Sequence, residues 1–236
     1  MENTPLISVV ITTFNRPELL IESVQSVLDQ TYQHFEIIIV DDCSSPENYT
    51  KTKDLTKLDE RIRVFQTPHN MGNNLAKNLG IRQANGEFVA ILDDDDLALP
   101  ERLEKQLAVF EKNPEIGVVA AQIRYIQSHG ISSYTYPPTV ALSNYPKSGD
   151  AVFSDLFLGY YNFANTVLLI RTDIIRANGY PDLRESGGDM VMMMKLAASG
   201  IPYAALKEPL VLVRKNSQHM QMTRELEAVQ KGRLNK

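Results

Sequence analysis

Short apolar runs alternate with amphipathic segments through the first half of the chain. The runs 6–13 (LISVVITT), 35–40 (FEIIIV) and 88–92 (FVAIL) are rich in β-branched residues, which is typical of strands buried in a parallel sheet. After Pro17, and again near 75–84, apolar residues recur at helical spacing. Strands that alternate with helices predict a parallel sheet with right-handed crossovers, so we expect an α/β fold.

The second half of the chain has a less regular pattern. The segment 128–149 is rich in Ser, Tyr, Pro and Gly and lacks periodicity, so we expect an extended loop there. No internal repeat or low-complexity tract divides the sequence. We expect further strands at 118–126, 163–171 and 209–213, and helices at 100–112, 190–198 and 223–232.

Polar and acidic residues follow each of the three buried runs. Thr12–Asn15 ends the first run, Asp41 and Asp42 follow the second, and Asp93–Asp96 follow the third. Ligands of open α/β sheets bind beyond the carboxyl ends of the strands, so these segments should converge on one edge of the sheet. There, Asp41 and Asp42 could accept hydrogen bonds from a base or a ribose, or they could simply end the strand in a turn.

The run of four aspartates carries the clearest chemistry. Neighbouring carboxylates repel one another and stay ionised together at low cost only near a cation. Mg²⁺ and Mn²⁺ bind carboxylate oxygens and substrate phosphates together. Alternation along an extended chain would place Asp93 and Asp95 on one side and Asp94 and Asp96 on the other, so one or two should contact the metal. The alternative is a solvated acidic turn, with Asp96 at the start of the next helix.

Composition narrows the class of protein. The chain has 236 residues, of which 43% are hydrophobic and 22% charged, as expected for one folded domain. A net charge of -5 argues against a nucleic-acid binder, and the single cysteine, Cys43, excludes an intramolecular disulfide. We find no signal-peptide pattern and no apolar run of about 18 residues, so we expect a cytoplasmic protein. The basic C-terminal segment favours either a solvated helix or peripheral contact with the inner face of a membrane.

Three segments together resemble a known family. Residues 7–45 and 70–106 are similar to family 2 inverting glycosyltransferases of the GT-A fold, and spore-coat-type members are a good comparison. The similarity is close over 5–110, where several motifs occur in the family's order. Residues 164–196 resemble the acceptor-side segment. The resemblance implies a Rossmann-like, mainly parallel sheet flanked by helices, in a single domain whose nucleotide-sugar half ends near residue 100 and whose acceptor half covers 101–236.

The resemblance also implies roles for individual residues. Lys77 stands where many relatives carry Arg, and Gly188 stands where many carry Glu, so the chain departs from the family pattern at two positions. His219 is a further candidate for a metal ligand or a diphosphate contact, although a lone histidine also suits a surface. The implied roles are base contacts for Thr12, Phe14 and Asp42, a nucleotide contact for Lys77, a ribose contact for Asp94, Mn²⁺ or Mg²⁺ ligation by Asp95 and Asp93, and general-base catalysis by Asp189.

These roles predict an inverting transfer from a UDP-, dTDP- or GDP-linked sugar to a hydroxyl of a glycan or glycolipid. A non-catalytic nucleotide-sugar binding protein would share the aspartates. A nucleotidyltransferase should carry a glycine-rich basic loop after its first strand, and TTFNRPE at 12–18 has no glycine. A receiver-like acidic domain would leave the second half of the chain unexplained. For Asp189, the alternative to a catalytic base is an N-cap of the helix at 190–198. The sugar, the acceptor and the oligomeric state are left open.

Overall fold

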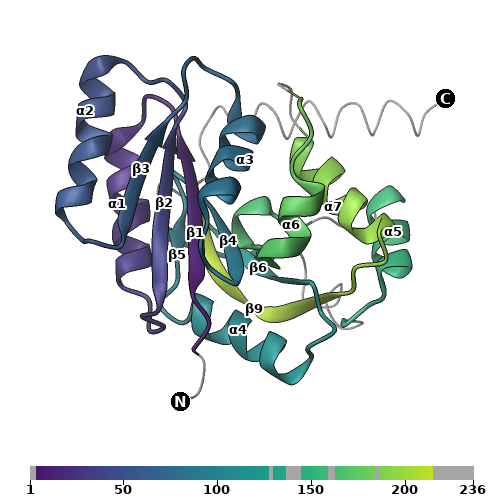
Figure 1. The fold of residues 1–236 in the computed structure, drawn as a ribbon. Coiled ribbons are helices and arrows are strands. Elements are labelled where there is room, and N and C mark those ends of the chain that lie inside the picture. Colours follow the sequence, from purple (N-terminus) through teal and green to yellow (C-terminus); the bar gives the residue numbers. More distant parts are fainter. Residues whose placement is uncertain (1–3, 128–129, 137–144, 159–162, 184–186, 215–236) are drawn as a thin grey trace, which may run out of the picture.

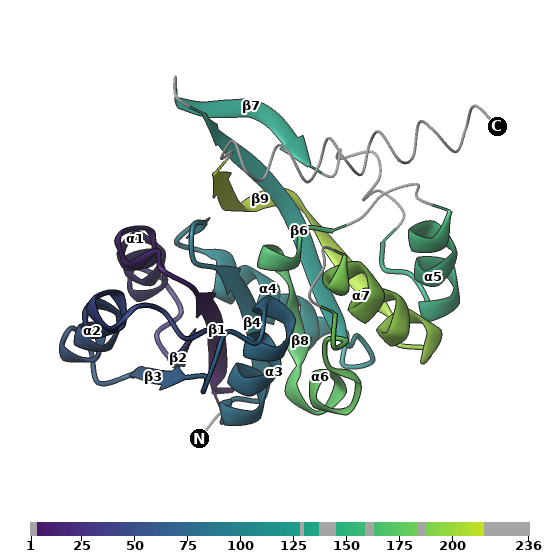
Figure 2. The same cartoon turned by 90° about the horizontal axis from the view of Figure 1, so that it is seen from above.

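One twisted sheet forms the centre of the domain, and helices pack against both of its faces (Figures 1 and 2). The computed structural model describes residues 4–127, 130–136, 145–158, 163–183 and 187–214. In chain order the strands are β1 (Ile7–Thr13), β2 (Phe35–Asp41), β3 (Ile62–Gln66), β4 (Phe88–Asp93), β5 (Leu97–Ala98), β6 (Val118–Gln127), β7 (Gly130–Tyr136), β8 (Leu169–Arg171) and β9 (Tyr203–Arg214).

The helices begin where the sequence provides start signals. Pro17 opens the first of them, where its fixed φ suits the first helical turn and its missing N–H costs nothing. Ser45 caps the second through its side-chain oxygen. The helices are α1 (Pro17–Leu28), α2 (Pro46–Asp54), α3 (Asn73–Gln83), α4 (Arg102–Lys112), α5 (Gly149–Phe157), α6 (Thr172–Asn178) and α7 (Gly188–Ala198), with short 3-10 turns η1 (Leu55–Lys57) and η3 (Asn165–Val167).

The strand order explains how the two halves of the chain form one sheet. The order is β3-β2-β1-β4-β8-β6-β9-β5, and β7 pairs with β6 outside this path. The first four strands are parallel, with Ile7 opposite both Phe35 and Phe88. β8 is antiparallel to β4 and β6, whereas β9 is parallel to β6. The predicted α/β fold is confirmed, and its parallel part brings the ends of β1, β2 and β4 to one edge.

Parts of the second half differ from the prediction. Residues 130–136, expected within an extended loop, form β7, which pairs antiparallel with β6 in a hairpin that extends away from the helices (Figure 2). The strand expected at 163–171 starts as η3 and is extended only from Leu169. The last strand begins at Tyr203, six residues before the predicted start. The helix expected at 223–232 lies outside the described residues.

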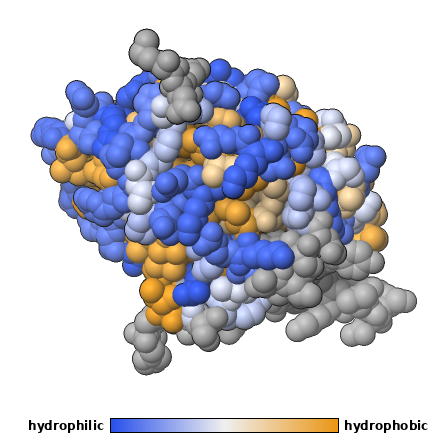
Figure 3. Space-filling view, turned by 90° about the horizontal axis from the view of Figure 1, so that it is seen from below, coloured by the Kyte–Doolittle hydropathy of each residue, from blue (hydrophilic) through white to orange (hydrophobic). Residues whose placement is uncertain are grey.

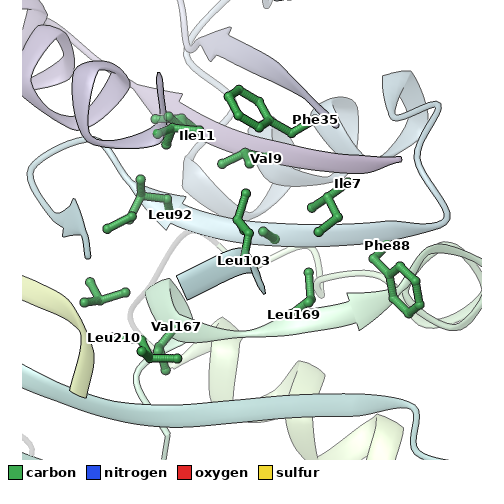
Figure 4. Packing of buried hydrophobic residues seen from close by; sticks show 14 of the residues in the cluster. Ile7, Val9, Ile11, Phe35, Phe88, Leu92, Leu103, Val167, Leu169 and Leu210 are labelled. Atoms are coloured by element: carbon green, nitrogen blue, oxygen red, sulfur yellow. The ribbon is translucent and has the colours of Figure 1, made fainter. Parts of the chain in front are cut away.

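Two apolar clusters fix the helices on opposite faces of the sheet. Ile7, Val9 and Ile11 of β1 point to the face covered by α1 and α4, and they pack near Leu103 (Figure 4). Val10 of β1 points to the other face, which α3, α5, α6 and α7 cover. This alternation buries every residue of β1, as expected for a central parallel strand.

The surface of the domain is largely polar. On the face shown in Figure 3, hydrophilic residues predominate and hydrophobic residues form several smaller groups. In the described part of the chain, no helix has both the length and the apolar character needed to cross a membrane. The basic C-terminal residues that suggested a peripheral membrane contact lie outside the described residues, so that contact stays a prediction.

Candidate functional site

A small pocket lies at the edge where the parallel strands end. Its volume is about 60 Å³. The end of β1 contributes to its lining, as do the starts of α1 and α3 and the turn that follows β4. The end of β1 and the aspartates that follow β4 were predicted to meet at this edge, and they do. The lining residues are Thr12, Arg16, Asn73, Asp93, Asp94 and Asp95.

Three of the four consecutive aspartates face this pocket, and a tight turn is the reason. β4 ends at Asp93, and the backbone N–H of Asp96 donates to the Asp93 carbonyl at 3.1 Å. The chain is therefore not extended beyond Asp93, and the predicted alternation of side chains is wrong from that point. Asp94 and Asp95 instead lie side by side, whereas Asp96 turns away and accepts a hydrogen bond from the backbone N–H of Arg214 at 3.2 Å.

Two basic side chains neutralise part of this acidic cluster. Lys77 Nζ lies 2.8 Å from Asp93 Oδ1, and the Lys77 side chain is only 4% exposed. Arg16 places Nη2 2.7 Å from Asp94 Oδ1 and Nη1 3.1 Å from Asp95 Oδ2, and its side chain is 42% exposed. Three carboxylates thus meet two cations, one fixed in the interior and one open to solvent.

Burial makes the charge on two of the aspartates costly. Loss of solvent raises the pKa of Asp94 to about 6, although the Arg16 guanidinium and Thr13 oppose the rise. Burial, with the nearby charges of Asp93 and Asp95, also raises the pKa of Asp96 well above its usual range. Both shifts have the sign that burial and neighbouring carboxylates give to an acidic group.

The donor set fits a hard divalent cation that shares its ligands with a substrate. Both Asp94 oxygens are buried and lack a hydrogen-bond partner of good geometry within the described residues, apart from the ion pair with Arg16. Carboxylate oxygens are the ligands that Mg²⁺ and Mn²⁺ prefer. Across the described residues, no three acidic, histidine or cysteine side chains converge closely enough to form a complete metal cage. A metal here would therefore need oxygens from a bound diphosphate or from water.

Asp42 shapes the loop that leads into α3. Its Oδ1 accepts hydrogen bonds from Thr67 Oγ1 at 2.9 Å and Met71 N at 2.8 Å, and its Oδ2 accepts from Gly72 N at 2.8 Å. These three partners lie 25 to 30 residues away along the chain, so Asp42 does not form the local turn given as the alternative. Asp41 forms such a turn, because its Oδ1 accepts a hydrogen bond from Ser44 N at 2.8 Å. A carboxylate offers about four acceptor positions, so a contact of Asp42 with a base is still compatible with its network and stays a prediction.

The other predicted base contacts lie at the end of β1. Thr12 donates through its hydroxyl to Asn73 Oδ1, which links β1 to the first residue of α3. Phe14 is 44% exposed, as an aromatic ring that stacks on a planar ligand would be. Both positions suit the contacts with a base, which stay predictions.

Asp189 lies in the first turn of α7, separate from the lining of the pocket. The N-cap of this helix is Gly187, with a φ of 98°, so the prediction of Asp189 as an N-cap is wrong. The Asp189 carboxylate accepts a hydrogen bond from Met190 N at 2.8 Å and is partly exposed. The role of general base stays a prediction.

A buried tyrosine connects the pocket with the region of Asp189. Tyr180 donates its hydroxyl to Asn165 Oδ1 at 2.6 Å, and its ring lies 5.8 Å from Lys77 Nζ. Burial raises the pKa of Tyr180, and the charges of Asp93 and Asp189 add to the rise. Both carboxylates therefore act on the same phenol, Asp93 from the pocket and Asp189 from the first turn of α7.

Some functional candidates were missed from the sequence. Arg16 was passed over as part of a turn, although it lies inside the TTFNRPE segment that was expected at the sheet edge. Tyr180 and Asn165 gave no local signal, because only the fold brings them beside Lys77. His219 lies outside the described residues.

Comparison with known proteins identifies the family. The family model described as "Glycosyl transferase family 2" matches residues 8–172, which is more than half of the chain. The chain belongs to glycosyl transferase family 2. The resemblance noted in the sequence is thereby confirmed over the strands and turns that build the pocket.

A curated relative is similar to the chain in sequence, and two solved structures share its fold. The chain is 42% identical over 103 residues to the putative teichuronic acid biosynthesis glycosyltransferase TuaG of Bacillus subtilis, covering 44% of this chain and 41% of TuaG. S. aureus TarS 1-349 in complex with UDP has the same fold, with a TM-score of 0.71, 19% identity, and coverage of 89% of this chain and 60% of TarS. The mannosyltransferase PcManGT of Pyrobaculum calidifontis, in complex with GDP-Man and Mn²⁺, gives a TM-score of 0.67, 18% identity, and coverage of 91% and 57%. The chain spans about half the length of the curated relatives it matches.

Proposed function

We propose that this family 2 chain transfers a sugar from a nucleoside diphosphate sugar to an acceptor hydroxyl, with inversion at the anomeric carbon. The observation that carries the proposal is the pocket at the ends of β1 and β4, which Asp93, Asp94 and Asp95 line together. Such a cluster suits a divalent cation that carries a diphosphate. The structures of TarS with UDP and of PcManGT with GDP-Man and Mn²⁺ support this class of donor.

We assign the donor side of the reaction to residues at the pocket. Asp95 and Asp93 would hold Mn²⁺ or Mg²⁺, which neutralises charge on the departing diphosphate. Lys77, fixed against Asp93, adds a positive charge beside the phosphates. Asp94 would approach the ribose, and Phe14 would stack on the base. A divalent metal held there would stabilise the leaving group, so no acid would be required to protonate it.

We assign the acceptor side to Asp189. A carboxylate within hydrogen-bond reach of the acceptor hydroxyl can take its proton as the oxygen attacks the anomeric carbon. Direct displacement on the face opposite the diphosphate inverts the configuration. Asp189 is partly exposed at the start of α7, so an acceptor can reach it from solvent. By analogy with TuaG and with the putative colanic acid biosynthesis glycosyl transferase WcaA, we propose a polysaccharide or glycolipid acceptor.

Calorimetric titration of UDP, dTDP and GDP, each with and without Mn²⁺, tests the donor class. One of them should bind in a metal-dependent manner, and Asp95→Ala should abolish that dependence. Asp189→Asn should keep nucleotide binding while release of nucleoside diphosphate in the presence of glycan acceptors is lost. Asp59→Ala, far from the pocket on the loop before β3, is the matched control. Metal-independent binding in the wild type would refute the metal site, and full turnover by Asp189→Asn would remove Asp189 as base.

A further inference from the structure

Arg16 and Lys77 neutralise the same acidic cluster in opposite ways. Lys77 is buried and bonded to the more exposed carboxylate, since Asp93 is 28% exposed and Lys77 only 4%. Arg16 is 42% exposed and bonded to two carboxylates whose side chains are only 1% and 2% exposed. Lys77 is therefore a permanent part of the site. The Arg16 side chain can move away from the carboxylates without disturbing the fold, because it is partly exposed whereas Asp94 and Asp95 are buried.

The guanidinium of Arg16 contacts one of the proposed metal ligands, Asp95, and also the neighbouring Asp94. Its two terminal nitrogens reach one oxygen each of Asp94 and Asp95. A planar guanidinium is well suited to hold two carboxylate oxygens in a fixed geometry. A divalent cation that binds Asp95 through Oδ2 from the pocket would compete with the contact that Arg16 makes with this oxygen.

We propose that Arg16 is a built-in counter-cation of the metal site, which holds Asp94 and Asp95 in place in the metal-free protein and moves to the diphosphate when metal and nucleotide bind. The inference rests on the proposed function. Three carboxylates with Lys77 and Arg16 keep one excess negative charge. When a divalent ion replaces Arg16, that charge is balanced and the guanidinium becomes free for phosphate oxygens.

The exchange predicts that metal and nucleotide strengthen each other's binding through Arg16. Without nucleotide, Mn²⁺ must displace Arg16 into water, so binding is weakened. With nucleotide present, the diphosphate receives the displaced guanidinium, so the same displacement costs less. Coupling of this kind is reciprocal, and the affinity of either ligand reports it.

The test is a titration of Mn²⁺ alone, with free Mn²⁺ measured by electron paramagnetic resonance, on the wild type and on Arg16→Gln. Loss of one partly exposed ion pair should tighten Mn²⁺ binding by up to roughly fivefold. The titration is then repeated with the nucleoside diphosphate that binds in the calorimetric screen. The nucleotide should strengthen Mn²⁺ binding less in Arg16→Gln than in the wild type, by a similar factor.

Two further variants make the result specific to the site. Arg16→Lys keeps the charge but cannot contact both carboxylates through two nitrogens. We expect its Mn²⁺ affinity to lie between those of the wild type and Arg16→Gln. It also serves as the test variant if Arg16→Gln does not fold. Arg61→Gln removes the same charge from an arginine–carboxylate pair with Asp59, 2.8 Å long and away from the pocket, and should leave Mn²⁺ affinity unchanged.

The outcomes separate this inference from the proposed function. If the wild type binds Mn²⁺ with nucleotide but Arg16→Gln binds Mn²⁺ equally or more weakly, the role of Arg16 is refuted and the metal site stands. If neither protein binds Mn²⁺ with or without nucleotide, the metal-dependent function fails and the inference fails with it. Equal tightening by Arg61→Gln would attribute the effect to net charge and would also refute the inference.

Discussion

The negative charge of Asp94 should lower the stability of the protein without metal, compared with a neutral side chain at the same position. The carboxylate is buried, and burial outweighs the attraction of Arg16, so its pKa rises from 3.8 to about 6. Asparagine has nearly the same shape and carries no charge. Asp94→Asn should therefore stabilise the protein in the presence of a chelator, while it weakens a site that uses the charge.

The size of the effect follows from the pKa. A native pKa about two units above the ordinary value corresponds to roughly 3 kcal/mol, at about 1.4 kcal/mol per unit. Above pH 6 Asp94 is ionised in both the folded and the unfolded chain, so the folded state carries the whole penalty. As the pH falls from 6 towards 4, the folded protein takes up the proton first and the penalty disappears. The advantage of Asp94→Asn should thus be full above pH 6 and absent below about pH 4.

Thermal unfolding with a chelator between pH 4 and 8 measures this advantage as a difference between variant and wild type. For a chain of this length, roughly 3 kcal/mol corresponds to a melting temperature about 5–10 °C higher at pH 7.5. Asp59→Asn provides a control of opposite sign, because Arg61 lowers the pKa of Asp59 to about 2 and this partly exposed pair is stabilising at neutral pH. A difference that is absent at pH 7.5, or that grows as the pH falls to 4, would refute the reasoning.

Two further predictions concern the support beneath the pocket. Arg102→Met should lower the free energy of unfolding in urea by about 3–5 kcal/mol. The substitution leaves Asp96 without its buried counter-charge and removes the hydrogen bond to Ile91 O at 2.8 Å. Lys105→Met, at a more exposed site, should cost less than about 1 kcal/mol, and an equally small loss for Arg102→Met would contradict the prediction. Gly86→Ala should destabilise by about 1–3 kcal/mol or more, because a Cβ there would lie 2.6 Å from Leu6 O. In Gly188→Ala the atoms nearest to the new Cβ would belong to the side chain of Asn74, so the loss of stability should be much smaller. Equal losses of stability in the two variants would contradict this reasoning.

The parallel half of the sheet could be predicted because its strands are buried on both faces. Burial on both faces demands apolar runs such as 35–40 and 88–92, and no other arrangement of these runs with intervening helices is common. The same topology brings strand ends together, so the meeting of Thr12 with Asp93 followed from the sequence. The hairpin strand at 130–136 was missed because it is partly exposed and its polar residues weaken the alternating pattern.

The acidic cluster was predicted in composition but not in geometry. The alternation argument assumes an extended chain, and the hydrogen bond from Asp96 N to Asp93 O replaces that chain with a turn. Four consecutive aspartates favour such a turn, since short polar side chains compete with the strand ladder. Three of the four aspartates therefore line the pocket, and the expectation that one or two of them contact a metal stays a prediction.

The counter-cations could not be predicted because they come from separate elements. Lys77 follows from the family pattern, but its burial depends on how α3 packs against β1 and β2. Arg16 precedes Pro17, which suggests only a turn before a helix. Its contact with Asp94 and Asp95 requires the start of α1 to lie close to the end of β4. The long-range pairing of β1 with β4 sets this placement. Residues that balance a cluster of charges are thus found from the fold, because any nearby element can supply them.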